Sequence, residues 1–369
     1  MSGTDVGMPV FGWDVGGAHL KVSKVDRTGA LIDVAQWPCR LWQGLDQLHQ
    51  SIDAVLDRWP DARSAGASHA VTMTGEMVDL FADRADGVRA IANALASKLH
   101  GRLMFFGGGR WFDASACAAA WHEIASANWL ATASWVASCV HDALLIDIGS
   151  TTTDIIPIVR GWVAAIGGND ADRLIHGELV YQGVVRTPLC GVAHRIVFRN
   201  RTTNVMNEWF ATTADVYRLT GELWPPHDQH PSADNGPKTM AASCARLARM
   251  IGRDAADASE VEWRNFARHW RAVQLDTLYM NLARVRHAHP SLVGAPLVAA
   301  GCGRFLVTHL AQHDRCAMID ISSLGEMSLC GEETLADPQC AEWIATCAPA
   351  VAVAMLAAHT PRAHLYRAA

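Results

Sequence analysis

The chain has 369 residues, of which 50% are hydrophobic and 18% are charged. Its length exceeds the usual size of one compact domain, and its composition is too apolar for an intrinsically disordered protein. The formal net charge of -6 comes from mixed acids and bases without long blocks of one sign, which argues against nucleic acid as a partner. We therefore expect a globular protein of two domains with ample hydrophobic cores.

Three further features bear on the compartment. The chain does not open with a basic stretch followed by an apolar signal core, so nothing directs it to secretion. The ten cysteines include no Cys-x-x-Cys pair, which favours reduced and mostly buried thiols. The apolar stretch from Trp343 to Ala358 contains Pro349 and is short for a bilayer span, so it predicts a buried terminal helix. Together these features predict a cytoplasmic protein with no membrane partner.

The first third of the chain predicts a β-meander followed by alternating helices and strands. In chain order the expected elements are strands at 10–15, 19–25 and 31–37, a helix at 45–56, a strand at 68–73, a helix at 88–99 and a strand at 103–106. Glycine turns separate the first three strands. Such alternation is typical of α/β architecture.

The same pattern then returns later in the chain. Residues 111–140 predict helices, and new strands are expected at 144–149, 153–159 and 162–166. Asp14 and Asp147 end the first strand of each set and lie 133 residues apart, which indicates a duplicated unit. We expect a first domain at 1–140, completed by a C-terminal helix at 340–369. A second domain is expected at 141–339, with a helical insertion at about 200–289 and a Pro-rich loop at 224–238.

Each repeat contains a strand that ends in Asp-x-Gly. Glycines let backbone N–H groups approach phosphate oxygens, and an aspartate at a strand end can face a hydrated magnesium ion. The first turn follows Asp14 and has Lys21 close behind, whereas the second follows Asp147 and is filled with hydroxyls up to Asp154. One such turn is a weak signal, because glycine hairpins are common. Two in equivalent places, with a third glycine turn at 301–303, favour a phosphate-binding function.

These three turns resemble the two phosphate motifs and the adenosine motif of the superfamily that contains sugar kinases, acetate kinase and actin. The run from Gly149 to Asp154 is particularly similar to the hydantoinase and oxoprolinase branch of that superfamily. The resemblance implies an α/β fold of duplicated ribonuclease-H-like (actin-like) domains with a central cleft.

A narrower resemblance rests on the segments 12–21, 72–81, 147–156 and 183–189. Together they resemble the tetrahydromethanopterin-linked C1-transfer pathway proteins, which include the methanofuran-biosynthesis furan-methanamine synthase family. The similarity spans about residues 10–305. It implies a transferase of methanofuran or methylofuran biosynthesis. In that reaction the phenol oxygen of a (glutamyl)tyramine or tyrosine acceptor displaces pyrophosphate from an aminomethylfuran methyl diphosphate.

The resemblance also implies roles for individual residues. The predicted magnesium ligands are Asp14, Asp147 and Asp154. The predicted phosphate-binding residues are Gly16, Gly17, Lys21, Gly149, Ser150, Thr151, Thr152, Arg186, Gly301 and Gly303. The predicted catalytic residues are Asp147, Glu76 and Lys21, with Glu76 or Asp147 as the base, because a phenol is largely protonated at neutral pH. Two of these residues have structural alternatives: Glu76 can simply begin a helix, and Arg186 can form a surface ion pair.

The third turn departs from the kinase pattern. It reads Gly301-Cys302-Gly303 instead of a plain Gly-Gly pair, which argues against ATP as the substrate, and ATP binding stays open. Two alternatives therefore remain beside the transferase. One is an ATP-dependent small-molecule kinase or an amidohydrolase of the hydantoinase/oxoprolinase type, and the other is a non-catalytic actin-like nucleotide-binding protein. A homo-oligomer is compatible with each of them, and the sequence does not fix the acceptor or its glutamate chain.

Overall fold

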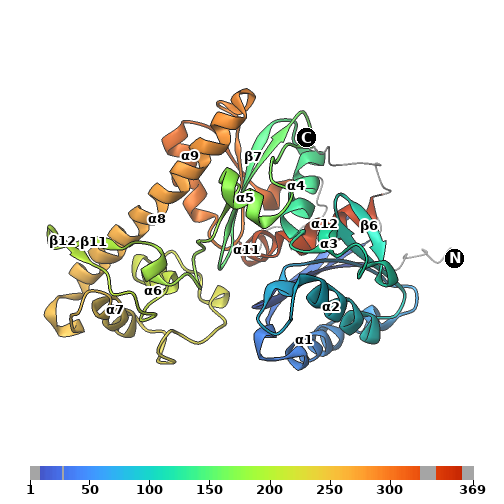
Figure 1. Cartoon of the computed structure of the whole chain (residues 1–369), viewed down its shortest axis with the longest axis horizontal. Helices are drawn as coiled ribbons and strands as arrows, with labels where there is room; N and C mark the ends of the chain where they lie inside the picture. Colours follow the sequence, from blue (N-terminus) through green and yellow to red (C-terminus); the bar gives the residue numbers. More distant parts are fainter. Residues whose placement is uncertain (1–8, 27–28, 325–337, 360–369) are drawn as a thin grey trace. The chain divides into compact units, whose positions relative to one another are not determined.

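The computed structural model describes residues 9–26, 29–324 and 338–359 (Figure 1). The chain divides into two compact units. The first combines the chain up to residue 143 with residues 158–169 and the chain from residue 319 onward, and the second comprises residues 144–157 and 170–318. The domain limits expected from the sequence stay a prediction, and the last ten residues of the expected C-terminal helix lie outside the described residues.

The first unit is built on a six-stranded sheet of order β3-β2-β1-β4-β5-β6. The strands are β1 (Val10–Val15), β2 (His19–Val25), β3 (Leu31–Pro38), β4 (Ser68–Met73), β5 (Arg102–Gly107) and β6 (Arg110–Asp113). The strands β1, β2 and β3 form an antiparallel meander, whereas β4 runs parallel to β1, and β5 parallel to β4. The expected meander and the strands that follow it are therefore present.

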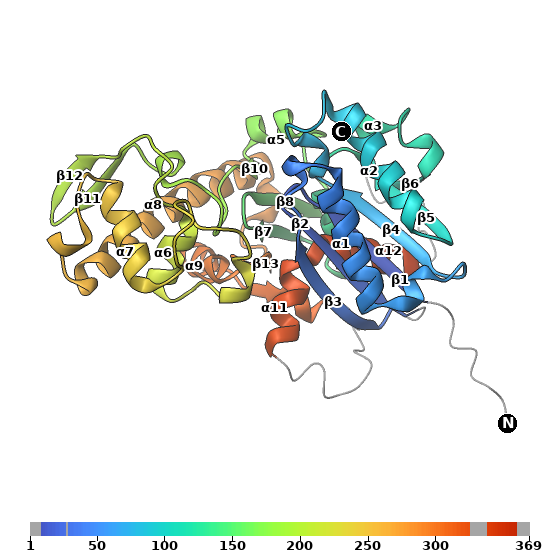
Figure 2. The same cartoon turned by 90° about the horizontal axis from the view of Figure 1, so that it is seen from below.

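Helices cover both faces of this sheet (Figure 2). They are α1 (Leu45–Arg58), α2 (Arg84–Lys98), α3 (Trp121–Ile124), α4 (Asn128–Cys139), α11 (Pro338–Thr346) and α12 (Ala348–Ala358). On one face Phe11 and Trp13 of β1 join the core that α1 and α2 close. On the other face Gly12 lets α12 approach, because a Cβ at Gly12 would lie 2.0 Å from the Ala350 carbonyl oxygen.

The apolar stretch near the C-terminus differs from the expected single helix. It forms two helices, α11 and α12, that meet at an angle of 82°. The break falls at Cys347, just before Pro349, because a proline lacks the N–H that would continue a helix. The side chains from Ala348 to Met355 are buried. No single helix among the described residues is long and apolar enough to cross a membrane, and only the bent pair of α11 and α12 meets that criterion of length and composition.

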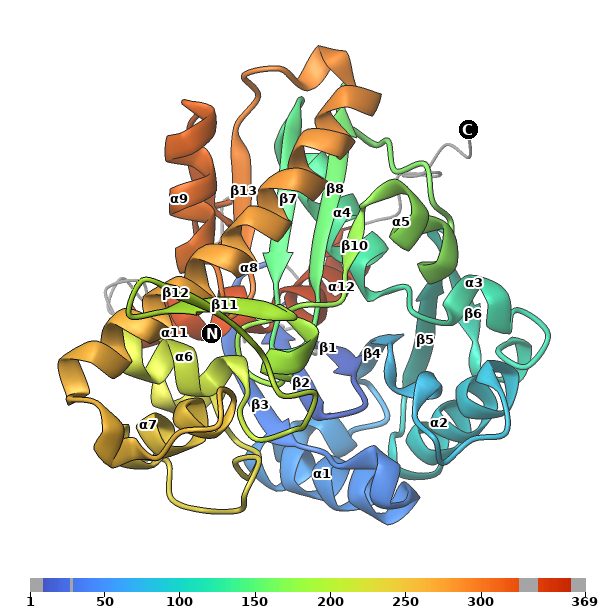
Figure 3. The same ribbon diagram turned by 60° about the vertical axis from the view of Figure 1, so that its left-hand side comes forward.

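The second sheet has the order β10-β8-β7-β13-β14, with β9 paired to β8 (Figure 3). Its strands are β7 (Ala143–Ile148), β8 (Thr153–Val159), β9 (Trp162–Val163), β10 (Leu179–Val180), β13 (Leu297–Ala300) and β14 (Met318–Asp320). Strand β13 runs parallel to β7, as β4 runs parallel to β1. In both sheets the strand with the Asp-x-Gly turn lies between its sequential successor and this parallel neighbour. The predicted fold class, α/β with duplicated ribonuclease-H-like units, is confirmed.

A largely helical insertion extends the second unit and has a hydrophobic core of its own. It contains α6 (Thr213–Thr220), α7 (Met240–Arg249) and the long α8 (Glu260–Ala288), which leads to β13; α5 (Asp170–His176) precedes the insertion and α9 (Phe305–Asp314) follows β13. A strand pair, β11 (Arg195–Phe198) and β12 (Arg201–Asn204), stands at the start of the expected helical insertion, and only β12 falls within the expected range of 200–289. Its two-residue turn has positive φ at both Arg199 and Asn200. That geometry matches the right-handed twist of a hairpin.

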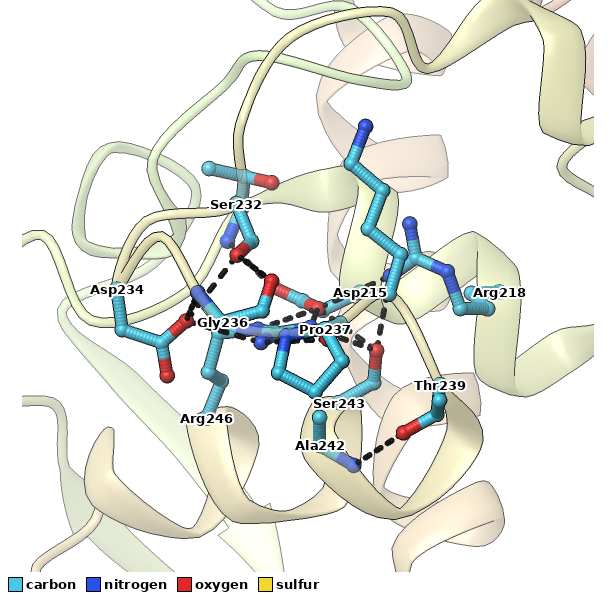
Figure 4. A network of polar contacts seen from close by, with 12 residues as sticks. Asp215, Arg218, Ser232, Asp234, Gly236, Pro237, Thr239, Ala242, Ser243 and Arg246 are labelled. Atoms are coloured by element: carbon cyan, nitrogen blue, oxygen red, sulfur yellow. Dashed lines mark hydrogen bonds and ion pairs between the residues drawn. The ribbon is translucent and has the colours of Figure 1, made fainter.

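The Pro-rich loop at 224–238 is tied to α6 and α7 by a buried polar network (Figure 4). Arg246 of α7 is fully buried and donates through Nε to Asp215 Oδ1 of α6, at 2.8 Å. The same guanidinium donates to Asp234 Oδ1 (3.0 Å) and to the Pro237 carbonyl oxygen (3.2 Å), both in the loop. Arg218 of α6 pairs with the loop residue Asp228. The loop is therefore anchored by charge-assisted hydrogen bonds to two helices.

Candidate functional site

The first glycine turn connects β1 to β2. Asp14 is buried at the end of β1, and Lys21 lies opposite it on β2, with Nζ 3.5 Å from Asp14 Oδ2. The Gly16 N–H donates to the His19 carbonyl oxygen (3.0 Å), which closes the turn. A Cβ at Gly17 would lie 2.7 Å from Val78, so this glycine permits a close approach of the segment that follows β4. The predicted residues Asp14, Gly16, Gly17 and Lys21 thus form one cluster.

The Thr-Gly-Glu segment after β4 packs directly on that turn. The Thr74 N–H donates to the Val15 carbonyl oxygen (3.0 Å), and a Cβ at Gly75 would lie 3.3 Å from the Gly16 carbonyl carbon. Glu76 lies in a single 3-10 turn, Gly75–Met77, and does not begin α2. It is only 1% exposed, and it accepts a hydrogen bond from Ser126 Oγ (2.8 Å). Ser126 is a partner that no sequence pattern indicated.

The second glycine turn connects β7 to β8 and has the same closure. The Gly149 N–H donates to the Thr152 carbonyl oxygen (2.8 Å), as Gly16 does to His19 in the first turn. The segment 183–187 lies against this turn. Arg186 N–H donates to the Ser150 carbonyl oxygen (2.8 Å), and Arg186 Nη1 lies 3.4 Å from Thr151 Oγ1. Burial lowers the pKa of the Arg186 guanidinium, although the neighbouring Tyr181 opposes the shift. Arg186 is therefore held against the second glycine turn by its backbone and lies close to it with its guanidinium.

The third glycine turn adjoins the second. Strand β13 pairs with β7 so that Ala300 lies opposite Asp147, which brings Gly301 beside the aspartate. A Cβ at Gly301 would lie 2.5 Å from Asp147 Oδ1, and the backbone there has φ +81°, which favours glycine. The Gly303 N–H donates to the Ile148 carbonyl oxygen (2.8 Å). Two of the three predicted turns thus converge on the end of β7, around Asp147.

Asp154 has a partner that the sequence did not reveal. Its Oδ1 forms an ion pair with Nη2 of Arg173, a residue of α5 that is 2% exposed. A metal ion at Asp154 would have to share the carboxylate with this buried cation. No cluster of three or more His, Cys, Asp or Glu side chains suited to a metal exists within residues 9–26, 29–324 and 338–359. Magnesium commonly takes only one or two protein carboxylates, with phosphate oxygens supplying further ligands, so the predicted ligands stay a prediction.

The predicted site residues thus fall into two half-sites. The first contains Asp14, Gly16, Gly17, Lys21 and Glu76. The second contains Asp147, Gly149, Ser150, Thr151, Thr152, Asp154, Arg186, Gly301 and Gly303. The expectation that both face one cleft stays a prediction, as does the role of each residue. The described cysteines form no disulfide bonds with one another, and Cys330 lies outside the described residues.

A profile of the hydantoinase/oxoprolinase family matches residues 68–331, more than half of the chain, and the chain belongs to this family. This confirms the resemblance seen at Gly149 to Asp154. A solved structure supports the fold alone: the nucleotide-free structure of acetone carboxylase is similar with a TM-score of 0.53 and 10% identity, covering 94% of this chain and 70% of that one.

Two curated relatives are more specific. Both are named as synthases of a furan-2-yl methanamine that carries a gamma-L-glutamylaminoethyl-phenoxymethyl group. The relative from Methanocaldococcus jannaschii is 29% identical over 260 residues, which cover 70% of this chain and 76% of that protein. The relative from Methanococcus vannielii is 34% identical over 144 residues, 39% of this chain and 64% of that protein. Their names support the expectation that the chain is an enzyme.

Proposed function

We propose that the chain is a transferase of methanofuran or methylofuran biosynthesis. It couples an aminomethylfuran methyl diphosphate to the phenol oxygen of a (glutamyl)tyramine or tyrosine acceptor and releases pyrophosphate. The product named for both curated relatives contains a phenoxymethyl group on a furan, which is the ether that such a coupling makes. The observation that carries the proposal is the convergence of two glycine turns and Arg186 on the end of β7.

The second half-site suits a diphosphate. Arg186 offers a planar guanidinium, the group that best matches phosphate geometry, and the hydroxyls of Ser150 and Thr151 lie in the adjoining turn. Partial burial of the guanidinium strengthens its attraction for an anion, because the surroundings are less polar than water. In the first half-site Lys21 is the cation available to phosphate. Each cation would stabilise negative charge on a phosphate group bound in its own half-site.

The acceptor phenol needs a base, since its pKa is about 10. We assign this role to Asp147, because it is less buried than Glu76 and ends the strand beside the second glycine turn, residues 149–152, which is called the phosphate turn in this proposal. Glu76 is buried and already accepts the Ser126 hydroxyl. In the proposed step the phenol oxygen bonds to the furan methylene carbon as the carbon–oxygen bond to diphosphate breaks. The electron pair leaves with pyrophosphate, and the phenol proton passes to the Asp147 carboxylate.

Magnesium is part of this proposal. Asp14 and Asp147 hold equivalent places, each at the end of a strand beside a glycine turn, and either carboxylate would serve as a ligand together with phosphate oxygens. The ion would neutralise charge on the leaving diphosphate. Asp154 is the weaker candidate, because Arg173 already engages it.

The decisive experiment offers the purified protein the furan methyl diphosphate together with tyramine, glutamyl-tyramine or tyrosine. We expect an ether product by mass spectrometry and an equal amount of pyrophosphate. An Arg186→Met variant should lose most of this activity, whereas Arg195→Met, at an exposed position of β11, should retain it. If neither ether nor pyrophosphate forms with any acceptor, the proposed function is wrong.

A second candidate is favoured by the family match: an ATP-dependent kinase or amidohydrolase of the hydantoinase/oxoprolinase type. Thermal stabilisation separates the two candidates, because a ligand that binds the native state raises the melting temperature. Stabilisation by magnesium with ATP would favour the second candidate. Stabilisation by magnesium with pyrophosphate, but not with ATP, would favour the transferase.

A further inference from the structure

The helical insertion reaches the second half-site through two buried polar side chains. Gln274 of α8 is 1% exposed, and Tyr217 of α6 is fully buried. Tyr217 Oη donates to Gln274 Oε1 at 2.7 Å, and Gln274 Nε2 donates to the Gly183 carbonyl oxygen at 3.0 Å. A hydrogen-bonded chain therefore runs from α6 through α8 to the segment that lies on the phosphate turn.

The orientation of this chain is fixed at both ends. A backbone carbonyl can only accept, so the Gln274 amide must direct its NH2 group to Gly183 and its oxygen to Tyr217. Burial raises the pKa of the Tyr217 phenol well above its usual range, so the hydroxyl keeps its proton and can donate. The Tyr217 ring also packs edge-on against Phe305, 5.2 Å between centroids, at the start of α9 just beyond the third glycine turn.

Gly183 is the residue at which the segment meets the phosphate turn. Its own N–H donates to Thr187 Oγ1 (2.8 Å), so both backbone polar groups of Gly183 are engaged. The next residue, Val184, donates its N–H to the Gly149 carbonyl oxygen (3.1 Å). Arg186 follows within the same segment and bonds the turn through its N–H. The hydrogen bond from Gln274 to the Gly183 carbonyl therefore helps to hold Arg186 at its position against the turn.

We propose that Gln274, held by Tyr217, is a positioning residue that sets the segment 183–187, and with it Arg186, for binding a diphosphate. In this proposal the helical insertion holds the segment 183–187 against the second glycine turn through the hydrogen bond from Gln274 to Gly183. The inference rests on the proposed function only in that the ligand is a diphosphate. A loosened segment should weaken diphosphate binding even where the protein stays folded.

The test measures pyrophosphate affinity by calorimetry in the full chain, with magnesium present. Gln274→Met removes both hydrogen bonds at similar volume, and we expect the dissociation constant to rise tenfold or more. Arg246→Met is the matched control, because it disrupts the buried network of the same insertion without touching Gly183. Below its melting temperature this control should bind pyrophosphate as the wild type does.

Gln274→Glu adds a second measurement, the pH dependence of pyrophosphate affinity, which would not change if Gln274 only stabilised the fold. A protonated glutamic acid can donate to the Gly183 carbonyl, whereas the carboxylate cannot, and burial raises the pKa of such an acid. The charged groups that act on Tyr217 include Glu222 and Arg271, which pair with each other at 2.8 Å. His309 of α9 faces the same two groups, and its pKa is lowered by burial and by Arg271, whereas Glu222 opposes the shift. Affinity of the variant should therefore be close to that of the wild type at acid pH and fall as the pH rises.

The outcomes separate the inference from the proposed function. Wild-type binding of pyrophosphate without ether formation would refute the proposed reaction and leave the affinity test of Gln274 intact. The inference is overturned if Gln274→Met binds pyrophosphate like the wild type, if Arg246→Met weakens binding equally, or if Gln274→Glu is no better than Gln274→Met at the lowest pH at which both are folded. A wild type that does not bind pyrophosphate overturns both.

Discussion

Replacing Gly183 by alanine places a methyl group where the second half-site has no room. A Cβ at Gly183 would lie 2.4 Å from the Thr151 nitrogen and 2.5 Å from both the Gly149 oxygen and the Ser150 carbonyl carbon. All three are backbone atoms of the second glycine turn, so the clash cannot be relieved by the movement of a flexible side chain. The clash must be relieved by moving the segment 183–187 off the turn.

The size of that movement follows from the contact distances. Restoring an ordinary separation of 3.4 Å from 2.4 Å requires a shift of about 1 Å. Such a shift weakens the backbone bonds from Val184 and Arg186 to the turn, worth about 1 kcal/mol each, and adds an overpacking cost of about 1–3 kcal/mol. Misplacing a binding group by about 1 Å typically lowers activity about 100-fold. We expect kcat/KM to fall by about that factor in Gly183→Ala.

The assay compares steady-state pyrophosphate release and melting temperature for this variant and for Gly191→Ala. A Cβ at Gly191 meets nothing within 4 Å, so the control adds the same methyl group in the same unit without a clash. We expect the control to match the wild type in both measurements. A Gly183→Ala variant with wild-type kinetics would refute the assignment of the turn, and an equal loss in Gly191→Ala would refute the steric explanation.

Three other outcomes follow from the described contacts. Asp147→Asn keeps the size of the side chain but removes its charge, so turnover should fall about a hundredfold or more, equivalent to about 2.7 kcal/mol, with little change in melting temperature. Burial lowers the pKa of His69 from 6.5 to about 4, and Trp13 Nε1 donates to its Nδ1, so the folded state holds the ring neutral. The resulting stability is complete above pH 6.5 and should decline by roughly 3 kcal/mol as the pH falls to 4, which denaturant titrations of the wild type and His69→Gln would measure. Arg246→Met removes the fully buried one of the two cations that pair with Asp215, and Arg218 remains at 3.2 Å from the carboxylate. The loss of these charge-assisted hydrogen bonds should cost about 1.5–3 kcal/mol of unfolding free energy in a denaturant titration.

The strands and turns were predictable because their signals are local. A strand shows its period over a few residues, and Asp-x-Gly at its end marks the turn, so β1, β2 and β7 lie close to where the sequence placed them. Two hairpins differ from the expectation. Gly108 and Gly109 form a two-residue turn between β5 and β6, and this glycine pair is a local hairpin signal, but the Ala- and Trp-rich composition that follows indicates helix. The turn between β11 and β12 is formed by Arg199 and Asn200 without a glycine, so the sequence gives that hairpin a weaker signal.

The supporting contacts were not predictable for a different reason. Arg173 reaches Asp154 across 19 positions, Ser126 reaches Glu76 across 50, and Gln274 reaches Gly183 across 91. A single buried arginine or glutamine in a helix has no pattern that names its partner. Only tertiary packing brings each pair together. The sequence therefore predicts the glycine turns but not the side chains that hold them in place.

The duplicated turns differ in charge at equivalent positions, and under the proposed function this difference suits the half-sites to different tasks. Lys21 follows Asp14 by seven positions on β2, and Asp154 follows Asp147 by seven positions on β8. In the first half-site a lysine therefore balances the strand-end aspartate directly, at 3.5 Å. In the second, the equivalent residue is an acid, Asp154, which pairs with the buried Arg173 of α5, and Asp170 lies 3.8 Å from the same guanidinium. Under the proposed function, this difference suits the first half-site to hold phosphate through Lys21 and leaves the second with the aspartate proposed as the base. If the function is right, exchanging the two residues in the double variant Lys21→Asp and Asp154→Lys should therefore abolish ether formation.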